Sequence, residues 1–438
     1  MRLSKRWLNA YRQRPHVNTD AILRSNEQSV VLNDQAIARV DVSQLAANKP
    51  IEDYFSAAKC LYSDAYLLGV FDGHGGSACS RNVSTRLFDY LCGAVLQKHR
   101  IFNSMLVQPL EWLFSSASER ILANSNDSHI QNMTTVRKAI QEACMALDDD
   151  LCNEAMPDNQ GYVSKLGIDV VISGSCALVA HIRYNNLHVA NVGDSEAVLG
   201  VYHSGSGGVM SRLLSRPHSS DNYDEVNRVR SNHPASESNT VLEANRLLGE
   251  LYPLRAFGDV RYKWSRELQK VVLGPLGFTA PLHLKTPPYL TAMPEVLYHQ
   301  LTPNDRFLVL ATDGLWEWLD PDTVVRLVHD HTLGAQTLSP FIPVAGQSLG
   351  KIFTDLDKRR KGGAKKPLDE NSATHVIRNA LGGVSGGAEL QYARLDKSLQ
   401  LPPGTARHFR DDITVIVIHF NEAFLSQSHN QEDYDIST

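Results

Sequence analysis

Cysteine pairs and long apolar runs are both scarce in this 438-residue chain. No two of its six cysteines have the C-x-x-C spacing of a zinc site, and none follows Cys176. The sequence therefore argues against a structural zinc ion or a disulfide framework, and it favours a reducing compartment. The longest apolar stretch, 170–182, is interrupted by serine and glycine and falls short of the roughly 18 residues that a membrane helix requires. No membrane span is predicted.

The chain also lacks a large excess of charge of one sign. Its 43 Lys and Arg residues against 48 Asp and Glu residues give a formal net charge of −5. No overall basic field therefore indicates nucleic-acid binding. With 42% hydrophobic and 21% charged residues, the composition is that of a globular protein, which excludes wholesale disorder.

The N-terminus departs from this even charge distribution. Residues 1–19 are rich in arginine and contain no acid. Such a segment, if it forms an amphipathic helix, is typical of an organelle transit peptide, but a disordered basic tail has the same composition. The residues alone leave both interpretations open. We expect 1–45 to be an N-terminal arm, 46–425 a single domain with insertions, and 426–438 a C-terminal tail.

Short β-rich runs alternate with longer helical segments along the domain. Strands are expected where apolar and β-branched residues stop at turn residues, and helices where apolar residues recur every three or four positions. A hairpin is expected around 183–186, and a helix beginning at Pro321 is expected to be capped by Asp320. The expected strands are 66–71, 170–182, 187–201, 307–312 and 413–420, and the expected helices are 80–96, 134–151 and 321–328.

Acidic residues lie at four expected strand ends: Glu52-Asp53, Asp72-Gly73, Asp313-Gly314 and Asp411-Asp412. A single Asp-Gly pair is most often only a turn. Four acidic strand ends in one chain are harder to dismiss, because clustered carboxylates repel one another unless cations lie between them. Carboxylate oxygens and an exposed glycine carbonyl suit Mg²⁺ or Mn²⁺. His74 lies at the same mouth as Asp72.

Six motifs in order carry a family resemblance. They are V-F-D-G-H-G-G at 70–76, S-G-S-C-A at 173–177, N-V-G-D-S at 191–195, L-R-A-F-G-D at 254–259, A-T-D-G-L-W-E at 311–317 and R-D-D-I-T at 410–414. The chain resembles the metal-dependent protein phosphatases of the 2C type. The resemblance implies an α+β fold: a four-layer α-β-β-α sandwich of two antiparallel sheets flanked by helices, with the active site where the strand ends meet.

The resemblance also implies two Mg²⁺ or Mn²⁺ ions and a role for each matching residue. Asp72 would bridge the two ions, Gly73 would offer its carbonyl to one, and Asp313 and Asp411 would complete the other. A hydroxide bridging the ions would attack phosphorus in line. His74 would act as the general acid that protonates the departing seryl or threonyl oxygen.

The resemblance also gives roles to residues around these ligands. Glu52 and Asp53 correspond to an acidic pair that holds metal-bound waters, while Asp194 and Glu317 are candidates for a third, weaker ion. Asn48 stands where many relatives have a phosphate-binding arginine, so phosphate binding should be weaker here. Two further departures from the family pattern are Glu196 in place of arginine and Pro217 in place of aspartate. Asp259 is expected to serve the turn that ends its motif at least as much as the chemistry.

A narrower resemblance rests on segments 47–53, 246–264, 286–292 and 373–378, which are similar to pyruvate dehydrogenase phosphatases. It implies a phosphorylated E1 subunit of pyruvate dehydrogenase as substrate, a mitochondrial matrix location and therefore a transit peptide. Animal relatives also suggest the lipoyl-bearing E2 core and a regulatory subunit as partners. Two alternatives are a general 2C-type phosphatase with other phosphoprotein substrates and a non-catalytic scaffold. The scaffold is disfavoured because the three ligand aspartates are all present.

Overall fold

The structure is a computed structural model that describes residues 19–95, 110–114, 136–205, 207–333, 346–360, 369–401 and 404–427. The expected transit peptide at 1–19 and the expected tail at 426–438 lie almost entirely outside these residues. Among the described residues, no helix has both the length and the apolar character needed to cross a membrane.

The first of two large sheets contains six antiparallel strands in the order β1-β2-β17-β16-β10-β11. Strand β17 pairs with β2 on one side and with β16 on the other. Its sequence, ITVIVIHF, is mostly β-branched, which favours a buried extended strand. The bounds are β1 Gln28–Asp34, β2 Ile37–Leu45, β10 Glu196–His203, β11 Gly208–Leu213, β16 Asp305–Ala311 and β17 Ile413–Phe420.

The second sheet is also six-stranded and antiparallel, in the order β15-β9-β8-β4-β3-β6. Every residue of β4 is buried, as expected for a strand covered on both faces. The expected hairpin is confirmed: β8 and β9 pair across a turn in which Tyr184 adopts a left-handed φ of 53°. The bounds are β3 Tyr54–Cys60, β4 Tyr66–Phe71, β6 Leu110–Trp112, β8 Ala177–Arg183, β9 Asn186–Val192 and β15 Glu295–Gln300.

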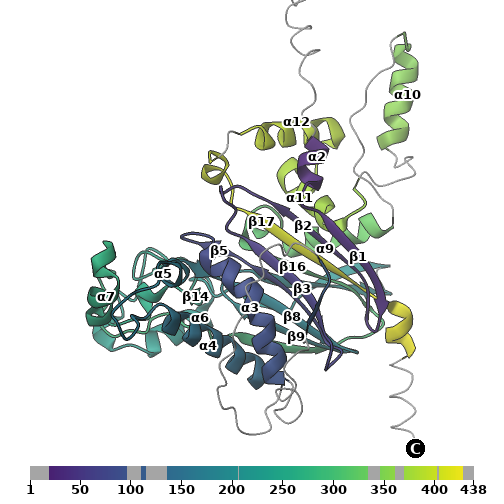
Figure 1. The fold of residues 1–438 in the computed structure, drawn as a ribbon. Coiled ribbons are helices and arrows are strands. Elements are labelled where there is room, and N and C mark those ends of the chain that lie inside the picture. The colour runs from purple at the N-terminus through teal and green to yellow at the C-terminus, as the bar shows by residue number, and fades with distance from the viewer. Residues whose placement is uncertain are drawn as a thin grey trace, which may run out of the picture.

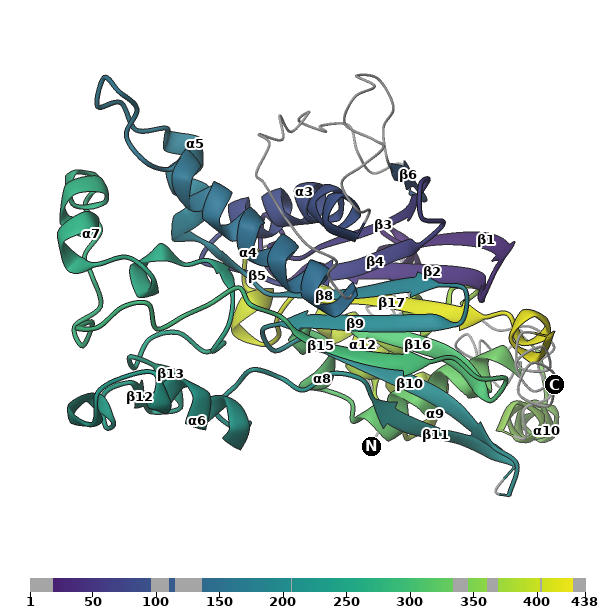
Figure 2. The ribbon, with the colours of Figure 1, turned by 90° about the horizontal axis from the view of Figure 1, so that it is seen from below.

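Helices cover the outer faces of both sheets (Figures 1 and 2). Helices α3 (Ala78–Val95) and α4 (Val136–Glu154) lie on the second sheet, and α9 (Pro321–Thr332) and α11 (Ser372–Gly382) lie on the first. The Asp320 side chain accepts from the Thr323 backbone N–H, so the expected cap of α9 is confirmed. The four layers are the predicted α-β-β-α sandwich.

Shorter elements complete the chain. Helices α6 and α7 and the small hairpin β12–β13 belong to the segment that extends to one side of the sandwich in Figure 2. The remaining bounds are α2 Thr19–Arg24, α5 Lys165–Ile172, α6 Tyr223–Ser231, β12 Leu242–Glu243, β13 Arg246–Leu247, α7 Arg266–Val272, α8 Asp313–Trp316, α10 Leu349–Arg360 and α12 Gly387–Leu399.

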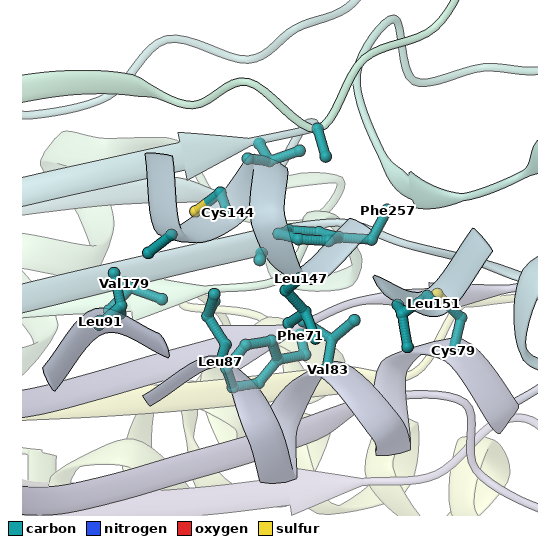
Figure 3. Close-up of a cluster of buried hydrophobic side chains, with 14 of the residues drawn as sticks. Phe71, Cys79, Val83, Leu87, Leu91, Cys144, Leu147, Leu151, Val179 and Phe257 are labelled. Carbon is teal, nitrogen blue, oxygen red and sulfur yellow. The ribbon is translucent and has the colours of Figure 1, made fainter. Parts of the chain in front are cut away.

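The hydrophobic core is divided among the layers. One cluster lies between α3, α4 and the second sheet, one between the two sheets, and one between the first sheet and α9 and α11. Figure 3 shows the first, where Val83 and Leu87 of α3 face Leu147 of α4 and Phe71 at the end of β4. Full burial of each such side chain contributes about 1.5–3 kcal/mol, so this packing fixes the end of β4.

Three expectations about local structure were wrong. Residues 19–45 were assigned to an N-terminal arm, yet β1 and β2 are strands of the first sheet, so the sandwich begins well before residue 46. Residues 170–172 end helix α5 instead of beginning a strand, because short apolar runs do not distinguish the two. The apolar run 187–201 is two strands, β9 and β10, which lie in different sheets.

Candidate active site

The acidic segments meet at one end of the sandwich. Strand β3 begins beside the end of β4, with Tyr54 paired to Phe71, and β17 begins beside the end of β16. Asp72 follows β4, Asp313 follows β16, and the segments that carry the other acids precede β3 and β17. Because neighbouring strands are antiparallel, one strand's end and the next one's start share an edge.

Three carboxylates converge at this edge. One oxygen from each of Asp72, Asp194 and Asp313 lies within 4.8 Å of the others. Asp194 reaches the group from the crossover between β9 and β10, where Gly193 has a φ of 109° that favours glycine. The fold thus places together residues that are more than one hundred positions apart in the sequence.

The electrostatics of this trio suit a divalent cation. Burial raises the pKa of Asp72 well above its ordinary value, and the charges of Asp313 and Asp53 raise it further. The pKa of Asp313 rises to about 8, first through burial and then through the charges of Asp194 and Asp411. Carboxylates held this close favour a bound cation, and hard oxygen donors are the ligands that Mg²⁺ and Mn²⁺ prefer. The donor set therefore fits the ions that the sequence predicts.

Asp411 lies at the rim of the trio. Its side chain is exposed, and its Oδ1 accepts from the Asp412 backbone N–H at 2.7 Å and from Asn48 Nδ2 at 3.3 Å. Its charge raises the pKa of Asp72, Asp313 and Glu317, which places it within electrostatic reach of all three. Its role as a ligand stays a prediction.

Asp412 was overlooked as a site residue, although its motif was recognised. It is 1% exposed, and it accepts backbone N–H groups of Ala47, Asn48 and Glu52. The Asn48 side chain donates to Asp412 Oδ2 at 3.2 Å. Asp412 therefore anchors the loop that carries the first acidic pair. The Asn48 amide group donates to both Asp411 and Asp412. If Asn48 also contacts the substrate phosphate, as predicted, the same amide group must serve both contacts.

The first acidic pair divides into two different environments. Asp53 is 3% exposed, and its Oδ2 accepts from the hydroxyls of Thr312 and Thr414 at 2.9 and 2.7 Å. The carboxylate of Glu52 is half-buried, and its pKa is raised by burial and by the charge of Asp412. Asp53 is thus fixed between strands β16 and β17, whereas Glu52 lies within electrostatic reach of Asp412 and Asp411.

Gly73 has no room for a side chain. A Cβ there would overlap the Glu52 carbonyl oxygen and the Ser80 hydroxyl, which are themselves hydrogen-bonded at 2.5 Å. Gly73 and His74 form β5, the edge of a three-stranded sheet with β7 (Gly174–Ser175) and β14 (Phe257–Gly258). This small sheet brings three of the sequence motifs together beside the acids.

His74 is paired with an acid. Its Nε2 lies 2.5 Å from Asp259 Oδ2, and the side chains are 27% and 7% exposed. Burial lowers the pKa of His74, but the charge and hydrogen bond of Asp259 outweigh it, so the net shift is upward. From the sequence, Asp259 is expected to serve its turn at least as much as the chemistry, and no local signal in the sequence links it to His74.

The remaining candidates flank the trio. Glu317 follows α8 and is exposed, and burial and the charge of Asp411 raise its pKa. Glu196, the charge-reversed position, is half-buried, and burial and the charge of Asp194 raise its pKa to about 7. His218, beside the substituted Pro217, is buried and accepts the Gly193 N–H at Nδ1, so it supports the turn before Asp194.

Known proteins match this chain over most of its length. Residues 47–342 match the family described as Protein phosphatase 2C. The chain is 40% identical to bovine [Pyruvate dehydrogenase [acetyl-transferring]]-phosphatase 1, mitochondrial (Bos taurus), with 95% of this chain and 85% of that protein covered. It is 37% identical to phosphatase 2 of Homo sapiens (91% and 82% covered) and 32% identical to phosphatase 1 of Saccharomyces cerevisiae (92% and 72% covered). The segment matched by the family includes all of the candidate acids except Asp411 and its neighbour Asp412.

Proposed function

Because this chain belongs to the protein phosphatase 2C family, we propose that it dephosphorylates phosphoserine on the E1 subunit of pyruvate dehydrogenase and so reactivates that complex. The observation that carries the substrate is the 40% identity across 95% of the chain to an enzyme named for that reaction. The observation that carries the chemistry is the convergence of Asp72, Asp194 and Asp313 at the strand ends.

The acids would hold two Mg²⁺ or Mn²⁺ ions. The carboxylates of Asp72, Asp313 and Asp411 and the carbonyl of Gly73 would be the groups that hold them. When bound, the ions supply positive charge that attracts the phosphate and lowers the pKa of water. Asp194 and Glu317 are the candidates for a third, weaker ion. Asp194 is the better placed of the two, because its carboxylate lies within the trio.

The surrounding residues would orient the reactants. Glu52 and Asp53 would hold waters by accepting hydrogen bonds, Asp53 from a position fixed by two threonines. His74 would donate a proton to the departing seryl oxygen, which makes that oxygen a better leaving group. Asn48 would supply a neutral hydrogen-bond donor near the phosphate where relatives supply a charge.

The location and partners follow from the same relatives. The bovine, human and yeast relatives are named as mitochondrial, and the matrix is the compartment that we propose for this chain. The lipoyl-bearing E2 core and a regulatory subunit are proposed partners on the same ground. Fusing residues 1–19 to a reporter should carry it into mitochondria, and a full-length chain found only in the cytosol would contradict this location.

Phosphate release from phosphorylated E1 tests the substrate directly. Release should require Mg²⁺ or Mn²⁺, stop when a chelator removes them, and exceed release from an unrelated phosphoprotein at equal concentration. Calcium is included as a third metal arm. Equal rates on both substrates would favour the general 2C-type phosphatase. The 33% identical relative from Schizosaccharomyces pombe, which is named only as a Protein phosphatase 2C homolog, is the reason to test for it. Activity that survives complete metal removal would overturn the metal-dependent mechanism.

A further inference from the structure

The small sheet β5-β7-β14 aligns three distant segments beside the acids. His74 pairs with Gly174, and Gly174 pairs in turn with Gly258. Gly174 therefore sits between the residue that carries the imidazole and the residue that precedes Asp259. Side chains of neighbouring strands on one face approach closely, so this register allows His74 and Asp259 to meet above the middle strand.

Gly174 leaves the space that the contact requires. A Cβ at this position would overlap both His74 Nε2 and Asp259 Oδ2. Backbone strain is not the reason for glycine here, because the φ of Gly174 is not positive. The glycine of the S-G-S-C-A motif is therefore explained by the passage of the imidazole and carboxylate over it.

Asp259 is held rigidly where it meets the ring. Its backbone has a left-handed φ of 52°, its N–H donates to the Ser173 carbonyl at 3.1 Å, and its carbonyl accepts from the Tyr262 N–H at 2.9 Å. The preceding Gly258 N–H donates to Asp148 Oδ1, and Asp148 is paired with the largely buried Lys263 at 2.7 Å. A carboxylate supported in this way can fix the orientation of a histidine.

We propose that Asp259 is a positioning residue for His74: its carboxylate accepts the Nε2–H and thereby turns Nδ1 toward the leaving oxygen of the substrate. This inference rests on the proposed phosphatase function and assigns a role to a residue outside the set of metal ligands. The pairing also fixes the tautomer, since a carboxylate can only accept at Nε2.

In the proposed step His74 gives one proton to the serine oxygen and later regains one that comes from the water. A water oxygen forms a bond to phosphorus while the bond from phosphorus to the seryl oxygen breaks, and the electron pair leaves on the seryl oxygen. That oxygen takes the proton from His74 Nδ1 and becomes the serine hydroxyl. One hydrogen of the water remains on the phosphate, and the other returns through solvent to Nδ1. Asp259 keeps its hydrogen bond to Nε2 throughout.

The test compares two leaving groups in the Asp259→Asn variant. A phosphoserine peptide needs a proton on its leaving oxygen, whereas p-nitrophenyl phosphate releases a stable anion. Because general acid catalysis contributes roughly 10²–10⁴-fold, we expect kcat to fall about 100-fold on the peptide and less than about threefold on the aryl ester. An equal loss on both substrates would assign Asp259 a merely structural role and overturn the proposal.

A double-mutant cycle with His74→Gln sharpens the result. If Asp259 acts through the ring, Asp259→Asn should add less than about twofold to the loss already caused by His74→Gln on the peptide. Independent, additive losses would contradict the coupling. The exposed Asp221→Asn is the matched control, and calorimetric Mg²⁺ and Mn²⁺ binding by each variant checks that the acids still bind metal.

The unmutated protein offers a readout that needs neither folding of a variant nor activity. Nitrogen NMR of the His74 ring should show Nε2 protonated and hydrogen-bonded, whereas an Nε2 without a proton would overturn the assignment. A wild-type chain that hydrolyses neither substrate with either metal would defeat the proposed function, yet the ring spectrum would still decide the pairing.

Discussion

Two groups of acids in this chain, one fully buried and one partly buried, differ in what surrounds them. Asp369 is fully buried, and Arg378, itself fully buried, donates to its two carboxylate oxygens at 2.6 Å each. Hydrogen bonds from His375 and Arg378 hold the pKa of Asp369 well below its ordinary value despite burial. Asp72 and Asp313 lie at the strand ends beside other acids, and their pKa values are raised.

The difference separates what stabilises the fold from what the site requires. Asp369, which lies just before α11, is neutralised by Arg378 of that helix and by Arg24 of α2, so it links the two helices. The acids at the strand ends repel one another, and their charge is left for a ligand to neutralise. Uncompensated polar groups of this kind are a cost that folded chains retain mainly at functional sites.

The largest effect is expected from removing one charge of the strand-end group. Asp72→Asn should lower kcat by at least about 10³-fold, or about 4 kcal/mol, because metal-ion catalysis supplies several kcal/mol of charge stabilisation. Without metal and above pH 8, where Asp313 is ionised, the same variant should melt at a higher temperature than the unmutated chain, since a repulsion has been removed. Phosphate release and thermal melting with chelator measure the two effects.

Asp221→Asn, an exposed change that conserves size in the same way, is the control for both measurements. An active Asp72→Asn variant would contradict the bridging role. A variant that melts lower than its parent in chelator would show that the strand-end acids are not mutually repulsive in the folded chain.

The opposite outcome is expected beneath α11. Arg378→Met should reduce the free energy of unfolding by about 3–5 kcal/mol, because it leaves Asp369 buried without its main partner. Metal affinity and kcat should be unchanged at temperatures where the variant is folded. Chemical denaturation measures the first, with the exposed Arg230→Met as control. A loss below about 1 kcal/mol would mean that the pair contributes as little as a surface salt bridge.

How much of this the sequence could supply depends on where each partner lies. The strand ends at Asp72, Asp313 and Asp411 were predictable, because an acid that follows or precedes a β-rich run needs only local information. Asp259 was not assigned to His74, because 185 positions separate them and only the register of β5, β7 and β14 joins them. The loop-anchoring role of Asp412 was missed for the same reason.

The start of the sandwich was misplaced by another cause. Strand β1 alternates between half-buried and exposed residues, which gives a weak hydrophobic pattern typical of an edge strand. Its neighbour β2 contains Asp41, an acid that is 1% exposed and accepts hydrogen bonds from Ser372 and Arg39. From the sequence alone, an acid within a strand is predicted to be exposed to solvent. Only the packing of α11 on β2 shows that Asp41 is buried.

The two groups should also respond to pH with opposite signs. The pKa of Asp313 is raised to about 8, so between its ordinary pKa of 3.8 and pH 8 the folded, metal-free chain holds a proton that the unfolded chain has lost. Its contribution to stability is therefore full below pH 3.8 and is lost as the pH rises toward 8. The pKa of Asp369 is lowered, so its contribution persists at neutral pH and is lost only in strong acid.

Bound metal should reverse the pH dependence that Asp313 gives to stability and leave the pH dependence from Asp369 unchanged. At 100 times its dissociation constant, Mg²⁺ or Mn²⁺ should stabilise the chain by about 2.7 kcal/mol. At one fixed metal concentration the gain should be larger at pH 8 than at pH 6, because protons compete with the metal for the carboxylates and so weaken its binding. Melting curves with metal and with chelator at both pH values measure this, and Asp72→Asn should reduce the gain. A metal-induced gain that falls between pH 6 and pH 8 would contradict competition at the strand ends.

The smallest effect is expected at the rim. Glu317 is exposed, so its charge interacts with that of Asp411 by only about 1 kcal/mol, as for charges separated by water. Glu317→Gln should raise the metal concentration for half-maximal activity by about two- to tenfold if the carboxylate helps to hold a third ion. If Glu317 only repels Asp411, the same change should lower that concentration. Metal titrations of activity and of heat decide the sign, with the exposed Glu267→Gln on α7 as control. The sign thus tells whether the uncompensated group of acids extends from Asp72, Asp194 and Asp313 out to Glu317 or ends at Asp411.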